Sequence, residues 1–329
     1  MRRIAIFGGG AWGTALALVA ARAGAEVTLW ARDPAIVAGI NERHENAIYL
    51  PGIALDRAIA ATSELEVALG GADAALLVVP AQFMRGVVGL LQPLLPGGLP
   101  LLLCSKGIET ESLRTMSELV ADILPDSPVA VLSGPSFAGE VARDLPTAVT
   151  IASRDAALAE AFMMALGTAR FRPYRSPEPI GVEIGGAVKN VLAIACGIVE
   201  GRGLGDNARA ALITRGLSEM IRLGRAKGAE PETFRGLSGL GDLVLTCTGG
   251  QSRNYTLGAA LGRGATLAAA LAGRRSVVEG VATAAAVARL AARLEVEMPI
   301  TAAVEGVLYR GMPIDTMIEA LLSRPYRSE

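Results

Sequence analysis

The chain opens with Ile4-Ala5-Ile6-Phe7-Gly8-Gly9-Gly10-Ala11-Trp12-Gly13, an apolar run that ends in glycines. The glycines have GxGxxG spacing directly after a strand-like segment, and a second strand-like segment follows at Glu26–Trp30. In this pattern Gly8 permits a tight turn, Gly10 lets the backbone approach a pyrophosphate, and Gly13 lets helix and strand pack closely. A helix N-terminus then offers free N–H groups and a favourable dipole to phosphate. The stretch therefore predicts a dinucleotide-binding turn.

The end of the second strand bears on the choice between the two nicotinamide dinucleotides. Sites that prefer NAD usually carry an acid there, which binds the ribose hydroxyls. The order in this chain is Trp30-Ala31-Arg32-Asp33. Arg32 can pair with a 2′-phosphate and favours NADP, whereas Asp33 keeps NAD possible. A solvated arginine at a strand end is also common, so the cofactor is expected to be NADP or NAD.

The first half of the chain alternates strand and helix patterns. A helix is predicted over Trp12–Ala23, and strands are predicted where short, nearly continuous apolar runs occur. These runs are Arg3–Phe7, Glu26–Trp30, Ala74–Val79, Leu99–Cys104, Val129–Leu132, Ala148–Ile151 and, at an edge of the sheet, Phe171–Tyr174. Such strands, separated by helices, are typical of a parallel sheet covered on both faces. The sequence predicts an α/β fold with a Rossmann-like, doubly wound N-terminal domain.

The pattern changes at Ser176-Pro177-Glu178-Pro179, where two prolines close the last strand. Beyond this point nearly all of the periodicity is helical. The predicted helices are Val182–Glu200, Asn207–Lys227, roughly Arg253–Leu261, Val281–Leu294 and Met317–Leu322. We therefore expect an NAD(P)-binding domain over residues 1–178 and an all-helical substrate-binding and catalytic domain over residues 179–329.

Composition narrows the class of protein. The chain has 329 residues, 51% of them hydrophobic, which is enough for two domains with their own cores. Its formal net charge of −1 and its 4% aromatic residues argue against a nucleic-acid partner. Met1-Arg2-Arg3 and the apolar stretch after it imitate a signal peptide, but the glycines at 8, 10 and 13 interrupt that stretch. No apolar run reaches the ~18 residues of a membrane span, so we expect a soluble, cytoplasmic protein without a membrane partner.

Cysteine and histidine offer little chemistry. The three cysteines, Cys104, Cys196 and Cys247, are widely spaced, which excludes a CxxC motif, a zinc cluster and a disulfide framework. We expect buried free thiols in a reducing compartment, and no metal site. The one histidine, His44, lies in a polar stretch, where a surface or cap role is the better interpretation.

Lys189 is the first candidate for acid–base chemistry. It lies in an otherwise apolar helix, and Gly185 and Gly186 precede it on the same face, where they are expected to leave open space. A lysine partly removed from water has a lowered pKa and can shuttle protons near neutrality. The alternative is a lysine that only reaches out of a buried helix. Two helix-weakening glycines in one turn and Asn190 argue against it.

Other polar residues follow strand ends, where ligands gather in open α/β sheets. Lys106 is equally compatible with a surface lysine and with a ligand in the crevice. Gly134 and Ser136 can present an N–H and a hydroxyl, or can simply form a turn. Asp242, which lies beside glycines, can orient Lys189, hold a substrate hydroxyl or cap a helix.

A third group of polar residues, Gln251-Ser252-Arg253-Asn254, opens a predicted helix. A hydroxyl, a guanidinium and an amide at a helix N-terminus make an anion site, and arginine suits phosphate bidentately. A solvated cap is a good alternative for Ser252 alone and a weaker one for the trio.

The chain resembles the NAD(P)-dependent glycerol-3-phosphate dehydrogenases of bacterial type, nearly end to end and in the same order. The resemblance rests on GGGAWGTALA (8–17), YLPGI (49–53), SKGIE (105–109), LSGPSFAGEVA (132–142), PTAVTIAS (146–153), GVEIGGAVKNVLAIACGIVEG (181–201), NARAALITRGLSEM (207–220), GLGDLVLTCTGGQSRN (239–254), VVEG (277–280) and MPI (298–300). Several of these segments are long and specific.

The resemblance implies roles for individual residues. Lys189 matches the family's proton donor and acceptor, and Thr246 resembles a hydroxyl that related eukaryotic enzymes place near the substrate. The substrate positions are matched by Lys106, Gly134, Ser136, Lys189, Asp242, Ser252, Arg253 and Asn254. Beside the turn glycines Gly8, Gly10 and Gly13, the cofactor positions are matched by Ala11, Trp12, Arg32, Lys106, Ala138, Arg253, Val277 and Glu279. A serine is frequent in the family where this chain has Ala11, so only backbone N–H groups would bind phosphate there.

The resemblance also implies a Rossmann domain followed by a helical domain, commonly as a homodimer. The implied reaction is the reversible reduction of dihydroxyacetone phosphate to sn-glycerol 3-phosphate by NAD(P)H, which supplies glycerophospholipid synthesis. In the expected mechanism the substrate phosphate binds at Ser252–Asn254. Lys189 protonates the forming alkoxide, Lys106 adds positive charge and Asp242 orients Lys189.

Two alternatives stay open. Dehydrogenases of the 6-phosphogluconate or hydroxyacyl-CoA type join the same two kinds of domain, but the second type calls for a catalytic histidine and none lies beyond position 44. A non-catalytic sensor of NAD(P)H would keep the glycine turn. It would not need Lys189, Asp242 and Arg253 together, which weighs against it.

Overall fold

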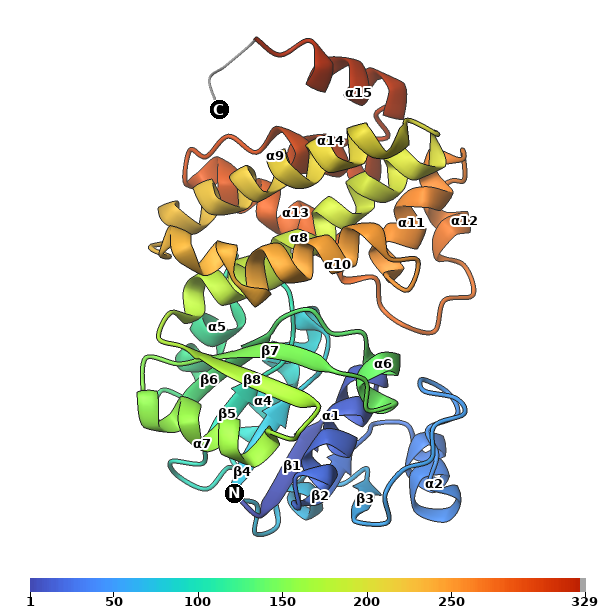
Figure 1. The fold of residues 1–329 in the computed structure, drawn as a ribbon. Coiled ribbons are helices and arrows are strands. Elements are labelled where there is room, and N and C mark those ends of the chain that lie inside the picture. The colour runs from blue at the N-terminus through green and yellow to red at the C-terminus, as the bar shows by residue number, and fades with distance from the viewer. Residues whose placement is uncertain (326–329) are drawn as a thin grey trace.

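The computed structural model describes residues 1–325 and shows a sheet flanked by helices, joined to a body made of helices (Figure 1). One sheet holds eight strands in the order β3-β2-β1-β4-β5-β6-β7-β8. The strands are β1 (Arg3–Phe7), β2 (Glu26–Trp30), β3 (Ile59–Thr62), β4 (Ala74–Leu77), β5 (Leu101–Leu103), β6 (Val129–Ser133), β7 (Thr147–Ala152) and β8 (Phe171–Ser176). The predicted edge strand is confirmed, because β8 ends the sheet. Strand β3 is not predicted from the sequence, and it is short and only half buried.

One pair of strands departs from the predicted parallel sheet. β6 and β7 are antiparallel, whereas the other neighbours in the sheet run parallel. The connection between them holds only the short helix α6 (Ala138–Ala142), which packs on α1 (Ala11–Arg22) instead of forming a crossover over the strands. A parallel connection usually needs a longer crossover helix. The expectation of a wholly parallel sheet is therefore wrong for this pair.

Helices cover both faces of the sheet, as the doubly wound prediction requires. Alternate residues of β1 show this directly. Ile6 packs in a core with α1 and α7 (Ala156–Leu166). Phe7 packs in a separate core with α4 (Met84–Leu91) and α5 (Met116–Ile123). Besides α1 and α6, the helices of this part are α2 (Pro34–Arg43), α3 (Leu65–Leu69), η1 (Ala81–Phe83), α4 (Met84–Leu91), α5 (Met116–Ile123) and α7 (Ala156–Leu166). The fold class expected from the sequence is confirmed.

The second half of the chain is helical throughout its described part. Its elements are α8 (Pro179–Gly201), α9 (Gly205–Ala226), η2 (Pro231–Arg235), η3 (Leu237–Gly241), α10 (Asp242–Thr248), α11 (Arg253–Gly262), α12 (Leu267–Leu271), α13 (Glu279–Arg293), α14 (Pro299–Tyr309) and α15 (Ile314–Leu322). Helices α10, α12 and α14 are not predicted from the sequence. β8 ends at Ser176 and α8 begins at Pro179, where the sequence places the domain boundary. Residues 326–329, the end of the expected second domain, lie outside the described residues.

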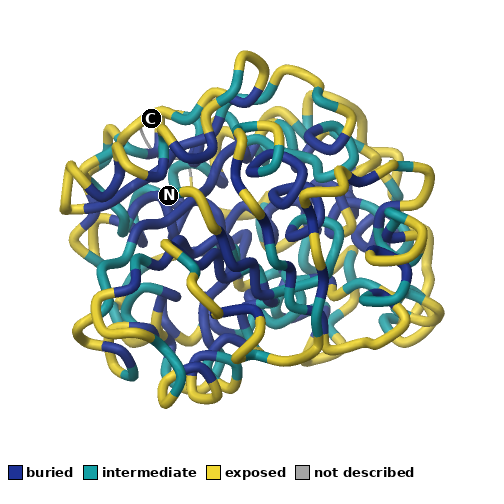
Figure 2. The backbone as a smooth tube through the Cα atoms, turned by 90° about the horizontal axis from the view of Figure 1, so that it is seen from below, coloured by how far each residue is buried: buried dark blue, intermediate teal, exposed yellow. Residues whose placement is uncertain are grey.

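Helix α8 is the central helix of this half. Within residues 1–325 it is the one helix long and apolar enough to cross a membrane, and its most apolar window is wholly buried inside the protein. Such burial is typical of a core helix. Figure 2 shows the same contrast for the described residues, with buried residues mostly in the middle and exposed residues mostly at the rim.

Four glycines let α8 and α11 approach closely. A Cβ atom on Gly197 would lie 2.1 Å from the carbonyl oxygen of Tyr255, and one on Gly258 would lie 2.1 Å from that of Ile194. Gly201 and Gly262 repeat the arrangement one turn further along each helix. Because backbone meets backbone here, the polar residues at the start of α11 lie against the middle of α8.

The structure agrees with the expected buried, free thiols and with a cap role for His44. Cys104, Cys196 and Cys247 are buried and free. His44 is the C-cap of α2 and has a left-handed backbone, with φ of 51°.

Candidate active site

The glycine turn fits a dinucleotide. A Cβ atom on Gly8 would lie 2.7 Å from the carbonyl oxygen of Val78, and one on Gly13 would lie 1.8 Å from that of Gly8. A Cβ atom on Gly10 would meet nothing within 4 Å, so the turn is open on that side. Gly10 is also the N-cap of the 12-residue helix α1 and provides no side-chain cap. The first N–H groups of α1 are therefore available to an anion.

The two residues at the end of β2 have different surroundings. The Oδ1 atom of Asp33 accepts a hydrogen bond of 2.9 Å from the backbone N–H of Ala35 and caps α2. Arg32 is exposed and has no ion pair among residues 1–325. The acid is thus already used to hold a helix end, whereas the guanidinium is free to meet an anion.

Three charged residues from distant parts of the chain meet at one carboxylate. Asp242 is the first residue of α10, and its Oδ1 lies 2.5 Å from Lys189 Nζ on α8. Its Oδ2 lies 2.8 Å from Lys106 Nζ, which follows β5. Thr246, one turn after Asp242, accepts a second hydrogen bond of 3.0 Å from Lys189. The side chains of Lys189 and Asp242 are 8% and 1% exposed, so water screens this cluster little.

The sequence predicted that the glycines beside Lys189 leave open space. The structure shows that they do not. A Cβ atom on Gly185 would lie 2.5 Å from the carbonyl oxygen of Ser238, and one on Gly186 would lie 2.8 Å from Ser133 Oγ. The space is filled by η3, the π-helical segment that leads into Asp242, and by the end of β6. The glycines thus act by close approach, which lets these two segments reach α8.

Burial sets the proton affinities of the cluster. Loss of water lowers the pKa of Lys189 to about 8, although the Asp242 carboxylate opposes this change and Lys106 adds to it. Burial alone would raise the pKa of Asp242, but the two lysines outweigh it and hold that pKa below its usual value. Asp242 is thus a stable anion, and Lys189 can change its protonation state near neutral pH.

Gly134 and Ser136 lie at the same place. The carbonyl oxygen of Gly134 accepts a hydrogen bond of 2.9 Å from Lys106 Nζ and one of 3.0 Å from Ser136 Oγ. Gly134 has φ of 134°, which a side chain would not tolerate without strain. The turn after β6 therefore holds the Lys106 ammonium beside Asp242.

The start of α11 presents one free charge. Ser252 caps the helix, because its Oγ accepts a hydrogen bond of 3.2 Å from the N–H of Tyr255. The Asn254 amide faces inward, where its Nδ2 donates to Asn190 Oδ1 at 2.8 Å and its Oδ1 accepts from Gly280 N–H at 2.9 Å. Arg253 is exposed, and its guanidinium has no hydrogen bond to any described residue.

Asn190 has no role predicted from the sequence. Its Nδ2 donates to the carbonyl oxygen of Lys106 at 3.2 Å, and its Oδ1 accepts from Asn254. It therefore ties the Lys106 loop to α11. An asparagine beside a lysine in an apolar helix was the available signal, but its partners could not be read from the sequence.

Glu279 lies across from the sheet at the start of α13. Its Oε1 accepts a hydrogen bond of 3.2 Å from Ala81 N–H, while its Oε2 is buried without a partner among the described residues. Burial raises the pKa of Glu279 to about 7. Trp12 Nε1 is likewise buried and unpaired within the described chain. Buried polar atoms usually have partners, so both atoms depart from the usual pattern.

The two remaining predicted residues are less constrained. Ala138 is the first residue of α6, and Val277 lies just before α13 with 41% of its surface exposed. Neither side chain can donate or accept a hydrogen bond, so each can offer only a contact or its backbone.

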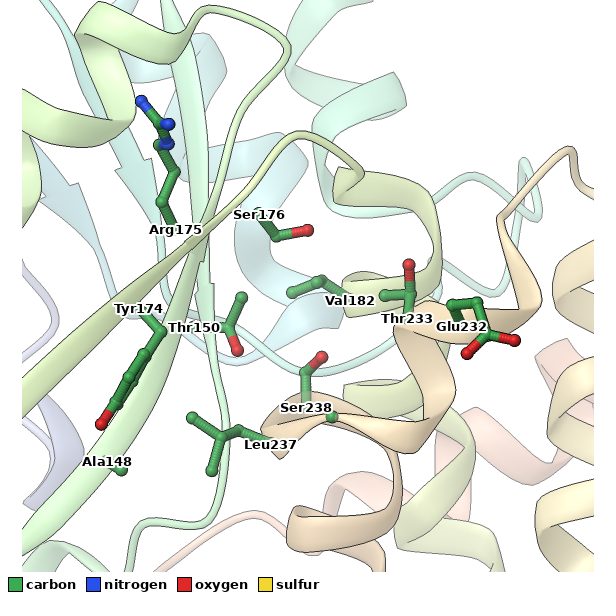
Figure 3. Close-up of a pocket in the computed structure, with 11 residues that line it drawn as sticks. Ala148, Thr150, Tyr174, Arg175, Ser176, Val182, Glu232, Thr233, Leu237 and Ser238 are labelled. Carbon is green, nitrogen blue, oxygen red and sulfur yellow. The ribbon is translucent and has the colours of Figure 1, made fainter.

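A cavity of about 420 Å³ lies apart from this cluster (Figure 3). It opens between β7, β8 and the segments η2 and η3, and hydroxyls of Thr150, Ser176, Thr233 and Ser238 line it. Its walls, as far as the described residues form them, include none of the predicted site residues. We therefore place the site at the lysine–aspartate cluster and not in this cavity.

Comparison with known proteins gives one consistent result. A family model described as NAD-dependent glycerol-3-phosphate dehydrogenase N-terminus matches residues 3–159, and the C-terminus model of that family matches residues 178–319. A protein of Rhodospirillum rubrum named NAD(P)+ glycerol-3-phosphate dehydrogenase is 60% identical over 326 residues, which cover 99% of this chain and 93% of that protein. A protein of the same name from Caulobacter vibrioides is 56% identical over 327 residues, which cover 99% of this chain and 98% of that protein.

Solved structures agree with this result. The crystal structure of glycerol-3-phosphate dehydrogenase from Coxiella burnetii superimposes with a TM-score of 0.95 at 42% identity. The match covers 98% of this chain and 99% of that one.

Proposed function

The chain belongs to the NAD-dependent glycerol-3-phosphate dehydrogenase family and is an NAD(P)-dependent oxidoreductase, and we propose that Lys189, Asp242 and Lys106 form its catalytic centre. The reaction is the reversible reduction of dihydroxyacetone phosphate to sn-glycerol 3-phosphate. One observation carries the assignment. A buried lysine with a pKa of about 8 lies between a stable carboxylate and a hydroxyl, at the carboxyl end of the sheet where α/β folds bind ligands.

Lys189 is the acid and base of the reaction. During reduction its protonated Nζ donates a proton to the substrate oxygen as the carbonyl becomes an alcohol. In the reverse direction its neutral Nζ takes the proton from the hydroxyl. Asp242 holds Nζ in place, and Lys106 contributes positive charge that favours an anionic substrate. Bound NAD(P)H supplies the hydride, which is the cofactor's own chemistry.

The substrate phosphate is proposed to bind at the start of α11. Arg253 offers an unpaired guanidinium there, which suits phosphate bidentately. Ser252 and Asn254 shape this helix end through their hydrogen bonds, and the first N–H groups of α11 add partial positive charge. Gly134 and Ser136 complete the substrate side by holding Lys106.

The residues present fit an NAD(P) cofactor. The turn of Gly8, Gly10, Ala11 and Gly13 would hold the diphosphate, with Trp12 beside it. On the nicotinamide side we place Lys106, Ala138, Arg253, Val277 and Glu279. We propose a preference for NADP, because Arg32 is free for a 2′-phosphate while Asp33 is committed to capping α2.

We propose several further properties. The domain boundary is placed at residues 178 and 179, where the sheet has ended and α8 begins. Buried free thiols suit a reducing, cytoplasmic location. A homodimer would bury some of the exposed apolar side chains, among which are Tyr309 at 50% and Leu322 at 80% exposure. Glycerophospholipid synthesis is the proposed use of the product.

The test measures loss of NADPH or NADH absorbance with dihydroxyacetone phosphate. Lys189→Arg should lose ~100–10,000-fold in kcat, because a guanidinium does not release a proton near neutral pH. Lys227→Arg is the matched control, since Lys227 pairs with Glu118 outside the site. Normal turnover by Lys189→Arg would refute the role of Lys189. If the folded wild-type protein binds the cofactor but does not oxidise it, dihydroxyacetone phosphate is refuted as the substrate.

A further inference from the structure

Asn46 is a buried side chain that the proposed mechanism does not use. It is 1% exposed and lies between α2 and β3, in the segment that follows the left-handed His44. Its Nδ2 donates to the carbonyl oxygen of Gly9 at 2.9 Å and to Thr14 Oγ1 at 2.8 Å. Its Oδ1 accepts from the N–H of Tyr49 at 3.3 Å. The amide thus connects a distant loop to the back of the glycine turn.

Thr14 extends this contact to the next carbonyl. Its Oγ1 donates to the carbonyl oxygen of Gly10 at 2.9 Å, and its backbone N–H bonds the same oxygen at 3.0 Å. Two consecutive carbonyls, those of Gly9 and Gly10, are therefore held from the interior side. Without Asn46, the Gly9 oxygen would lose its side-chain donor and the Thr14 hydroxyl would lose the donor that orients it.

Fixing the carbonyls also fixes the N–H groups. In a planar trans peptide the N–H points opposite to the C=O of the same unit. The carbonyls of Gly9 and Gly10 share their peptide planes with the N–H groups of Gly10 and Ala11. Those N–H groups consequently point away from the Asn46 amide. A Cβ atom on Gly10 would meet nothing within 4 Å, so the turn also has open space beside it. Since Ala11 has no polar side chain, phosphate binding at the glycine turn depends on these backbone N–H groups.

The loop that carries Asn46 is itself held in place. His44 accepts a hydrogen bond of 2.8 Å from the N–H of Leu55 through its carbonyl oxygen, and Glu45 pairs with Ala54 in an isolated bridge. The Glu45 carboxylate accepts a further bond of 2.8 Å from the N–H of Gly52. Asn46 therefore lies in a loop whose conformation is fixed by hydrogen bonds.

We propose that Asn46 is a positioning residue of the cofactor site, which holds the Gly9 and Gly10 peptide planes so that their N–H groups face the cofactor diphosphate. The proposal rests on the NAD(P) site described above. Asn46 does not touch the cofactor itself and acts through Gly9 and Thr14. It links the loop at residues 44–55 to phosphate binding at the start of α1.

The test measures binding rather than turnover. Dissociation constants for NADPH, ADP-ribose and AMP are determined by calorimetry for the wild type, Asn46→Ala, Asn46→Asp and Thr14→Val. Asn46→Ala should weaken NADPH and ADP-ribose about tenfold, the equivalent of one hydrogen bond, and AMP less than about twofold because AMP has no diphosphate. Asn46→Asp keeps the acceptor for Tyr49 but loses the donor to Gly9, so it should weaken the two diphosphates at least as much. Thr14→Val should weaken them about threefold.

Asn41→Ala is the matched control. The Asn41 amide makes a comparable pair of bonds, of 2.9 and 2.8 Å, to the backbone of Ala61 in β3, away from the glycine turn. It should lower the melting temperature and leave the NADPH affinity within about twofold of the wild type. The Michaelis constant for dihydroxyacetone phosphate at saturating NADPH should be unchanged in Asn46→Ala.

Two results would overturn the proposal. Unchanged NADPH and ADP-ribose affinity in a folded Asn46→Ala protein would make Asn46 merely structural. Equal weakening of AMP and ADP-ribose would show a general collapse of the site. If Asn46→Ala does not fold, the pair Asn46→Asp and Thr14→Val decides by the same comparison. The dissociation constants do not depend on which substrate is oxidised or reduced, so they separate this proposal from the proposed reaction.

Discussion

Lys189 Nζ lies 2.5 Å from Asp242 Oδ1, although the two residues are 53 positions apart in the chain. Lys106 bonds the other oxygen of the same carboxylate at 2.8 Å. With both lysines protonated, the cluster keeps one net positive charge in a site from which most water is excluded. That charge favours a phosphorylated substrate and also destabilises the protonated form of Lys189. Binding and proton transfer are thus served by one arrangement.

The pH dependence of the reaction should follow Lys189, whose pKa is about 8. Reduction needs protonated Lys189, so kcat/KM for dihydroxyacetone phosphate should be constant below this pH and fall above it. Oxidation of glycerol 3-phosphate needs neutral Lys189, so its kcat/KM should fall below the same pH. Profiles of kcat/KM in both directions check this, because they report the free enzyme. Limbs that fall in the same direction for both reactions would contradict the role of Lys189.

Removal of the Asp242 charge should move these limbs. Asp242 raises the pKa of Lys189 against the effect of burial, so Asp242→Asn should lower that pKa further and shift both limbs to lower pH. The loss of one partner from a buried ion pair should also cost ~3 kcal/mol of unfolding free energy. Urea unfolding and pH profiles of the variant measure the two effects.

The control for that variant is Asp315→Asn. Asp315 pairs with Arg202, but its side chain is 70% exposed, so the stability change should stay below ~1 kcal/mol. If the falling limb of the Asp242→Asn pH profile stays at the same pH as in the wild type, another group controls the profile.

Arg32 should decide the cofactor preference. Arg32→Ala should lower kcat/KM for NADPH by roughly 10–100-fold, since a hydrogen bond to a charged group contributes ~1.5–3 kcal/mol, and should leave NADH almost unaffected. The ratio of the two efficiencies is the measurement. Arg154→Ala, which removes an exposed arginine next to β7, should leave the ratio unchanged. Equal losses with both cofactors would place Arg32 outside the 2′-phosphate site.

The close approach of α8 and α11 should make Gly197 intolerant of a side chain. In Gly197→Ala the new Cβ would lie 2.1 Å from a backbone oxygen, so the helices must separate, at a cost of ~1–3 kcal/mol or more. Gly89→Ala in α4 is the control, since its Cβ would meet nothing within 4 Å and alanine favours a helix by ~1 kcal/mol. Urea unfolding should therefore show opposite signs for the two variants. A neutral Gly197→Ala would mean that the helix contact is not tight.

Local patterns in the sequence were sufficient to predict much of the fold of this protein. Consecutive apolar residues ending in glycines predicted β1, the turn and α1, because backbone sterics and burial on both faces act within a few residues. The prolines around Glu178 predicted where the strands end and the helices take over. Lys189 stood out because a charged residue in an apolar helix needs a partner. The family resemblance predicted the reaction, which hydrophobic periodicity alone cannot predict.

Relations between distant segments were decided only by the tertiary structure. Strand direction depends on the path of the connection, so the antiparallel pairing of β6 and β7 could not be read from their residues. The glycines beside Lys189 were expected to leave space, yet η3 and the end of β6 occupy it. Asn46 lies in a polar loop with no local signal, and its amide reaches Gly9 from 37 positions away. Hydrophobic periodicity records which face of an element is buried, whereas hydrogen bonds and close approaches depend on which other element covers that face.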